Sequence, residues 1–238
     1  MNTPTDTPRP ILERTPIRPP GTRAVRPRDA ATLFIVRRDG DKPKVLMGKR
    51  AAGHKFMPNL WVFPGGRIDR ADYRAPYGVD LPPDVAATFQ RHISISKARA
   101  LGLAAIRETF EEAGLLLGKP GAARAGSDPW KDFLAHGVLP DLGALSIIFR
   151  AVTPPSVGKR FDTWFLMADA EHLVSLERQP DCGELEEIAW FDFEEAAALD
   201  LPMVTRAVLK ETAARLENPA RPIPYMRFRA GPPKPRVL

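Results

Sequence analysis

Three glutamates near the middle of the chain are the side chains best placed to do chemistry. Glu108, Glu111 and Glu112 are spaced i, i+3 and i+4, so on an α-helix their carboxylates converge on one face. Like charges at this spacing repel one another, and the helix dipole disfavours anions near a helix C-terminus. A hard divalent cation, Mg²⁺ or Mn²⁺, would offset both costs, whereas a solvated acidic helix face is the alternative interpretation.

The residues around the glutamates predict a helix that presents them away from the core. Between Ser96 and Ala113 the apolar side chains form one arc, opposite to the three carboxylates. Gly114 follows the last periodic residue, as expected of a glycine that ends a helix. The residues of the apolar arc are Leu103, Ile106, Thr109, Phe110 and Ala113.

The rest of the chain alternates short β-rich segments with helical ones. Strands are expected at 30–37, 44–47, 60–63, 146–152, 161–168 and 188–193. Further helices are expected at 82–91, 194–199 and 202–216. This order predicts an α/β domain in which a mixed β-sheet is sandwiched between helices, an α-β-α arrangement.

The positive charge of the chain, a formal net charge of +6, is concentrated at its two ends. Residues 1–28 and 217–238 hold the excess arginine and half of the 26 prolines, whereas residues 29–216 are slightly acidic. We therefore predict a Pro/Arg-rich N-terminal arm (1–28), one central domain (29–216) and a Pro/Arg-rich C-terminal tail (217–238), both ends being extended. This distribution argues against a nucleic-acid partner.

Composition excludes several other classes of protein. No run of apolar residues approaches the roughly 18–20 that span a bilayer, and the first residues lack an apolar signal segment, so we expect a cytoplasmic protein without a membrane partner. The single cysteine, Cys182, excludes an intrachain disulfide and argues against a cysteine-based zinc site.

The glutamates lie in a segment that resembles the Nudix box, the signature of the Nudix hydrolase family. The family pattern is G-x5-E-x7-R-E-U-x-E-E-x-G-U, with U apolar, and residues 107–115 read RETFEEAGL. The start of the box is similar to FPGG at residues 63–66, which follows an expected strand. The resemblance covers roughly residues 29–200. It implies the Nudix fold and metal-dependent hydrolysis of a diphosphate bond in a nucleoside-diphosphate-linked small molecule.

The resemblance implies a role for each matching residue. The expected ligands for Mg²⁺ or Mn²⁺ are Glu108, Glu111, Glu112 and the carbonyl of Gly65. Arg107 is expected to orient a box carboxylate through a charge-assisted hydrogen bond. Family members differ in their general base: Glu111 is our first choice, and Glu184 in a later loop is the alternative.

The box of this chain is interrupted. Gly66 and Arg107 are 41 positions apart where the family has 14, so 27 residues are inserted. We place the insertion at about 67–100 and treat it as a candidate cap or homodimer contact. The glutamate that the family has eight positions before the arginine is not identifiable, and Asp69 or Asp72 could substitute for it only loosely.

An insertion inside the box resembles the coenzyme A diphosphatase branch of the family. Coenzyme A-cleaving members carry L-L-T-x-R-S-x3-R-x3-G-x3-F-P-G-G, and residues 46–66 read LMGKRAAGHKFMPNLWVFPGG at the same length. Arg50 and the FPGG match, whereas Lys55 replaces the second arginine and the Thr, Ser and Gly positions differ. We expect Arg50, Lys55 and Gly66 to contact the substrate, with coenzyme A or acyl-coenzyme A as the first candidate.

The sequence is compatible with two alternatives. The degenerate upstream motif is compatible with ADP-ribose, a dinucleotide or another nucleotide diphosphate as the substrate. A non-catalytic nucleotide-binding Nudix protein is the other alternative, which the complete E-x-x-E-E set disfavours.

Overall fold

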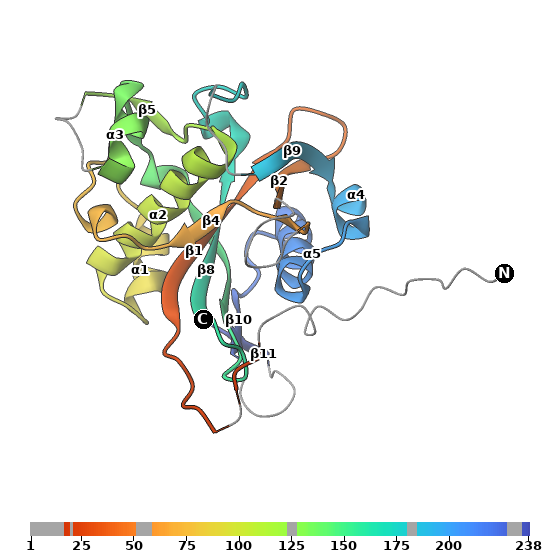
Figure 1. Ribbon diagram of the computed structural model, residues 1–238. Coiled ribbons are helices and arrows are strands. Elements are labelled where there is room, and N and C mark those ends of the chain that lie inside the picture. Colours follow the sequence, from red (N-terminus) through yellow and green to blue (C-terminus); the bar gives the residue numbers. More distant parts are fainter. Residues whose placement is uncertain (1–16, 20, 51–58, 123–127, 180–184, 228–234) are drawn as a thin grey trace.

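The computed structural model describes residues 17–19, 21–50, 59–122, 128–179, 185–227 and 235–238 (Figure 1). Its strands are β1 (Arg28–Arg37), β2 (Lys44–Arg50), β3 (Trp61–Val62), β4 (Gly65–Arg67), β5 (Gly118–Pro120), β6 (Val138–Pro140), β7 (Ser146–Val152), β8 (Phe161–Asp169), β9 (Leu185–Asp192), β10 (Pro224–Arg227) and β11 (Pro235–Val237). Its α-helices are α1 (Pro83–Gln90), α2 (Ile95–Ala113), α3 (Asp128–Ala135), α4 (Phe193–Ala198) and α5 (Met203–Glu217).

A nine-stranded mixed sheet forms the centre of the molecule. Its strands run in the order β11-β10-β7-β8-β1-β2-β3, with β4 added to β1 and β9 added to β2. Helices α1, α2 and α3 lie on one side of the sheet and α4 and α5 on the other (Figure 1). The predicted α/β fold, a mixed sheet between helices, is confirmed.

Strand β1 holds the FPGG segment in place through its pairing with β4. The strand pairs in parallel with β8 over most of its length, and its Leu-Phe-Ile-Val run at residues 33–36 is fully buried between the two helical layers. Such a run is typical of a strand covered on both faces. On its other edge β1 pairs with β4, with Thr32 opposite Gly65 and Ala31 opposite Gly66. The two glycines are therefore fixed to the most buried strand of the sheet.

Helix α2 crosses this part of the sheet as the apolar arc predicts. Ser94 caps its first turn by accepting a hydrogen bond from the Lys97 N–H, and Gly114 ends it with a left-handed φ of 69°. Most of its side chains between Ala98 and Ala113 are buried. None of the helices described here is long and apolar enough to cross a membrane.

Two parts of the fold differ from expectation. The region between α2 and β7 forms a two-stranded antiparallel sheet, β5 with β6, and helix α3 between them, where no element was expected. The tail after α5, expected to be an extended arm, contributes β10, which pairs in parallel with β7, and β11, which pairs with β10. The division of the chain at residues 28 and 216 stays a prediction, but the described part of the tail belongs to the sheet.

Candidate active site

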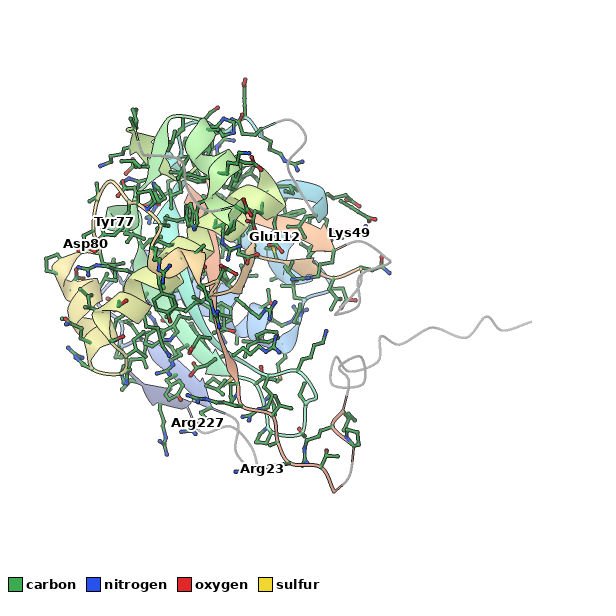
Figure 2. The ribbon with its side chains drawn as sticks, turned by 60° about the vertical axis from the view of Figure 1, so that its left-hand side comes forward. Arg23, Lys49, Tyr77, Asp80, Glu112 and Arg227 are labelled. Carbon is green, nitrogen blue, oxygen red and sulfur yellow. The ribbon has the colours of Figure 1, made fainter. Side chains whose placement is uncertain are left out.

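The C-terminal half of α2 lies directly on the two glycines of β4. The Gly65 N–H donates a hydrogen bond to Glu112 Oε2 at 2.8 Å, and Glu112, labelled in Figure 2, is only 6% exposed. A β-carbon on Gly66 would overlap the carboxylate of Glu108, and one on Gly65 would overlap the backbone of β1. The backbone of β1 therefore leaves room only for glycine at residue 65, whereas a side chain at residue 66 would have to displace Glu108.

Arg107 joins this helix to the loop that follows β4. The residue is only 5% exposed, and each of its five N–H groups has an acceptor. Nη1 donates to Glu108 at 3.0 Å and to Glu111 at 2.8 Å, while Nε and Nη2 bind Asp72 at 3.0 and 3.2 Å. Nη2 also donates to the Arg67 carbonyl at 3.1 Å. The guanidinium is thus held in a single orientation against two of the three glutamates.

Asp72 occupies the place of the glutamate that could not be identified in the sequence. Its carboxylate is fully buried and pairs with Arg107, which corrects the expectation that it could substitute only loosely. Five residues separate Gly66 from Asp72, as in the G-x5-E half of the box, so counting forward from the glycine identifies Asp72 in the sequence. The insertion therefore begins after Asp72, later than the boundary that we placed at residue 67.

Burial and neighbouring charges shift the pKa values of Glu111 and Arg107. Burial raises the pKa of Glu111, and the positive charge of Arg107 opposes this shift. Burial also acts to lower the pKa of Arg107, but its hydrogen bond to Asp72 and the charge of Glu108 outweigh burial and raise that pKa. Arg107 therefore stays charged, and Glu111, whose side chain is 36% exposed, is the more accessible of its two glutamate partners.

The donor set fits a hard divalent cation by its chemistry, because it consists of carboxylate oxygens and a backbone carbonyl oxygen. Within the described residues, however, no three His, Cys, Asp or Glu side chains are grouped so that they could hold a metal ion. Glu108 and Glu111 face Arg107, and Glu112 faces the Gly65 N–H. The assignment of these glutamates and the Gly65 carbonyl as ligands stays a prediction, and it requires the carboxylates to turn towards a common point.

The other predicted site residues are only partly described. Arg50 ends β2, where its N–H donates to the Leu60 carbonyl at 3.1 Å. Asn59, at the position where the coenzyme A pattern has glycine, adopts a left-handed φ of 59°, a conformation that asparagine tolerates better than most residues. Lys55 and Glu184 lie outside the described residues.

Comparison with known proteins defines the class of this fold and site. No protein-family model matches the chain. The solved structure of a NUDIX hydrolase from Alicyclobacillus acidocaldarius is 30% identical, with a TM-score of 0.60 over 78% of this chain and 90% of that one. The chain belongs to the Nudix hydrolase family, as the sequence predicted.

Two curated proteins are similar over part of their length. The chain is 34% identical to the acyl-coenzyme A diphosphatase NUDT19 of Gallus gallus over 119 residues, which are 41% of this chain and 32% of that protein. It is 28% identical to the putative nudix hydrolase 7 of Caenorhabditis elegans over 164 residues, 63% of this chain and 46% of that protein. The chain thus matches less than half the length of each.

Proposed function

We propose that this protein hydrolyses a diphosphate bond in a nucleoside-diphosphate-linked small molecule, with Mg²⁺ or Mn²⁺ as its cofactor. The observation that supports this best is the close approach of Glu108 and Glu112 to the glycines of β4, where Glu112 accepts from the Gly65 N–H, with Glu111 bound to the neighbouring Arg107. The three carboxylates and the Gly65 carbonyl would hold the cation. Once bound, a divalent cation supplies neutralisation of the phosphoryl oxygens and a more acidic water.

The side chains of the chain itself would bind, orient and accept a proton. Arg107 donates to both Glu108 and Glu111 through one nitrogen, which would restrict how far the two carboxylates move as they turn towards the cation. Glu111 is our candidate for the group that takes the proton from the attacking water, because burial raises its pKa and its side chain remains partly exposed. Glu184 stays the alternative general base.

Coenzyme A or an acyl-coenzyme A is the substrate that we propose first. Cleavage of its diphosphate would give 3′,5′-ADP and the phosphopantetheine portion. The proposal is supported by the similarity to an acyl-coenzyme A diphosphatase and by the upstream motif, in which Arg50 is kept and Asn59, at the place of the motif glycine, has a left-handed φ that glycine adopts readily. Arg50, Lys55 and Gly66 are the residues that we propose to contact the substrate.

ADP-ribose or a dinucleotide is the second candidate, because the Thr, Ser and second Arg of the coenzyme A motif are absent. A substrate panel decides between them. The full chain is incubated with coenzyme A, acetyl-coenzyme A, ADP-ribose and diadenosine polyphosphates, each with Mg²⁺ and with Mn²⁺, and kcat/KM is measured from the products. A larger kcat/KM for ADP-ribose or a dinucleotide would overturn the coenzyme A assignment. Absence of turnover with every diphosphate would overturn the enzymatic function and favour nucleotide binding alone.

A further inference from the structure

Trp130 lies against the buried carboxylate that holds Arg107. Its Nε1 donates a hydrogen bond to Asp72 Oδ1 at 3.0 Å, and neither side chain is exposed. Trp130 belongs to α3, outside both the Nudix box and the inserted segment. We propose that Trp130 is a positioning residue, which acts through Asp72 and Arg107 to keep Glu108 and Glu111 beside the proposed site of the divalent cation. This inference rests on the proposed function and adds a residue to its site.

The hydrogen bonds of Asp72 leave no acceptor position unused. Oδ1 accepts from Arg107 Nε at 3.0 Å and from Trp130 Nε1, and Oδ2 accepts from the Asp69 N–H at 2.7 Å and from Arg107 Nη2 at 3.2 Å. A carboxylate with two bonds to each oxygen cannot rotate without breaking several of them. Without the indole N–H, Oδ1 would lack one partner in a place that solvent does not reach, which favours reorientation of the whole group.

Arg107 transmits this orientation to the glutamates. The guanidinium is planar and rigid, so the edge that binds Asp72 and the nitrogen that binds Glu108 and Glu111 move together. Any turn of the Asp72 carboxylate therefore displaces the donor that both glutamates share. Partners of ligating carboxylates influence metal affinity and activity strongly, even when they never touch the metal.

Aromatic packing fixes the indole itself. Trp130 meets Phe133 edge to face, with ring centroids 5.4 Å apart, and Phe133 meets Phe110 of α2 at 5.5 Å in the same manner. Phe110 directly precedes Glu111 in the helix. The Trp130 ring therefore also stabilises the core by packing. That structural role depends on the shape of the ring and not on its N–H.

The experiment separates the N–H from the ring. Trp130 is replaced site-specifically by β-(3-benzothienyl)alanine, which keeps the bicyclic shape but carries sulfur in place of N–H, and, in a second variant, Trp130→Phe. Trp164→Phe is the control, because Trp164 is equally buried but its ring lies over Arg150, 4.5 Å away, at β7. Mn²⁺ binding to the full chain is measured by titration calorimetry, and kcat and KM are measured with the preferred diphosphate.

We expect both Trp130 replacements to weaken Mn²⁺ binding by about 10-fold or more and to lower kcat by a similar factor, with KM changed far less. Trp164→Phe should keep the Mn²⁺ affinity within about 2-fold, a small change beside the 10–100-fold typical of lost second-sphere contacts. Wild-type Mn²⁺ affinity in the benzothienyl variant would overturn the inference and leave Trp130 as a core residue. If the wild-type chain binds Mn²⁺ but cleaves no diphosphate, the proposed function fails, whereas the positioning role is still decided by the Mn²⁺ affinities of the variants.

Discussion

Gly66 and Glu108 lie so close together that a β-carbon on the glycine would overlap the carboxylate of the glutamate. The neighbouring pair, Gly65 and Glu112, is joined by a hydrogen bond of 2.8 Å. These two contacts bring together halves of the Nudix box that are far apart in the sequence. The inserted segment can therefore be long without separating the loop from the helix, because its two ends meet at β4 and α2.

Gly66→Ala is expected to displace Glu108 and to lower kcat/KM by about 100-fold, since a shift of about 1 Å in a site can cost that much. The fold should persist, because the displaced side chain is partly exposed. Gly40→Ala is the matched control, as a β-carbon there meets nothing within 4 Å, and its activity should equal that of the wild type. Unchanged activity in Gly66→Ala would show that the position of Glu108 is not needed.

Arg107→Lys is expected to lower the free energy of unfolding by about 3–5 kcal/mol, measured by urea denaturation. Lysine keeps the charge but cannot form the paired hydrogen bonds, so the fully buried Asp72 loses donors. Arg99→Lys is the control on the same helix, because Arg99 also makes two hydrogen bonds to an aspartate, Asp80, but the pair is exposed. The decrease in the free energy of unfolding of Arg99→Lys should stay below about 1 kcal/mol. Equal losses in the two variants would contradict the importance of the buried pair.

The fold could be predicted where local pattern decides it. The apolar run of β1 and the helical arc of α2 carry their own signal, and both lie within a few residues of their predicted bounds. Strand β10 gives no such signal, because it is four residues long and begins with a proline. It forms through contacts distant in sequence: it pairs with β7, and Arg150 lies between the rings of Trp164 and Tyr225.

The residues of the candidate site likewise differ in whether a local sequence pattern identifies them. The glutamates of α2 could be found because their spacing along one helix is a local property. Asp72 could have been found by counting forward from Gly66, but its burial and its pairing with Arg107 depend on how the loop folds back onto α2. Trp130 gives no sequence signal, since its contact with Asp72 exists only once α3 packs against α2.

Glu111→Gln tests the proposed general base. The amide keeps the size of the side chain and an oxygen that can accept from Arg107, but it cannot take a proton, so kcat should fall by about 100- to 10,000-fold. The free energy of unfolding should change little, because burial already disfavours the charged form of Glu111. Glu217→Gln, at the exposed end of α5, should retain wild-type kcat. Substantial activity in Glu111→Gln would favour Glu184 as the base.

The pair of Asp80, just before α1, and Arg99 of α2 gives a prediction about pH. Arg99 donates to Asp80 at 2.6 and 2.9 Å, and this hydrogen bonding holds the pKa of Asp80 below its usual value. Because the folded state has the lower pKa, the pair stabilises the fold above about pH 4, and this contribution is lost as the pH falls through the folded pKa. Asp80→Asn should therefore lower the free energy of unfolding at pH 7, by less than about 1 kcal/mol because the pair is exposed. The difference from the wild type should shrink as the pH falls through the folded pKa of Asp80, whereas Asp41→Asn in an exposed turn should match the wild type throughout. A difference that is constant from pH 7 to pH 2 would show that Asp80 acts through its shape and not through its charge.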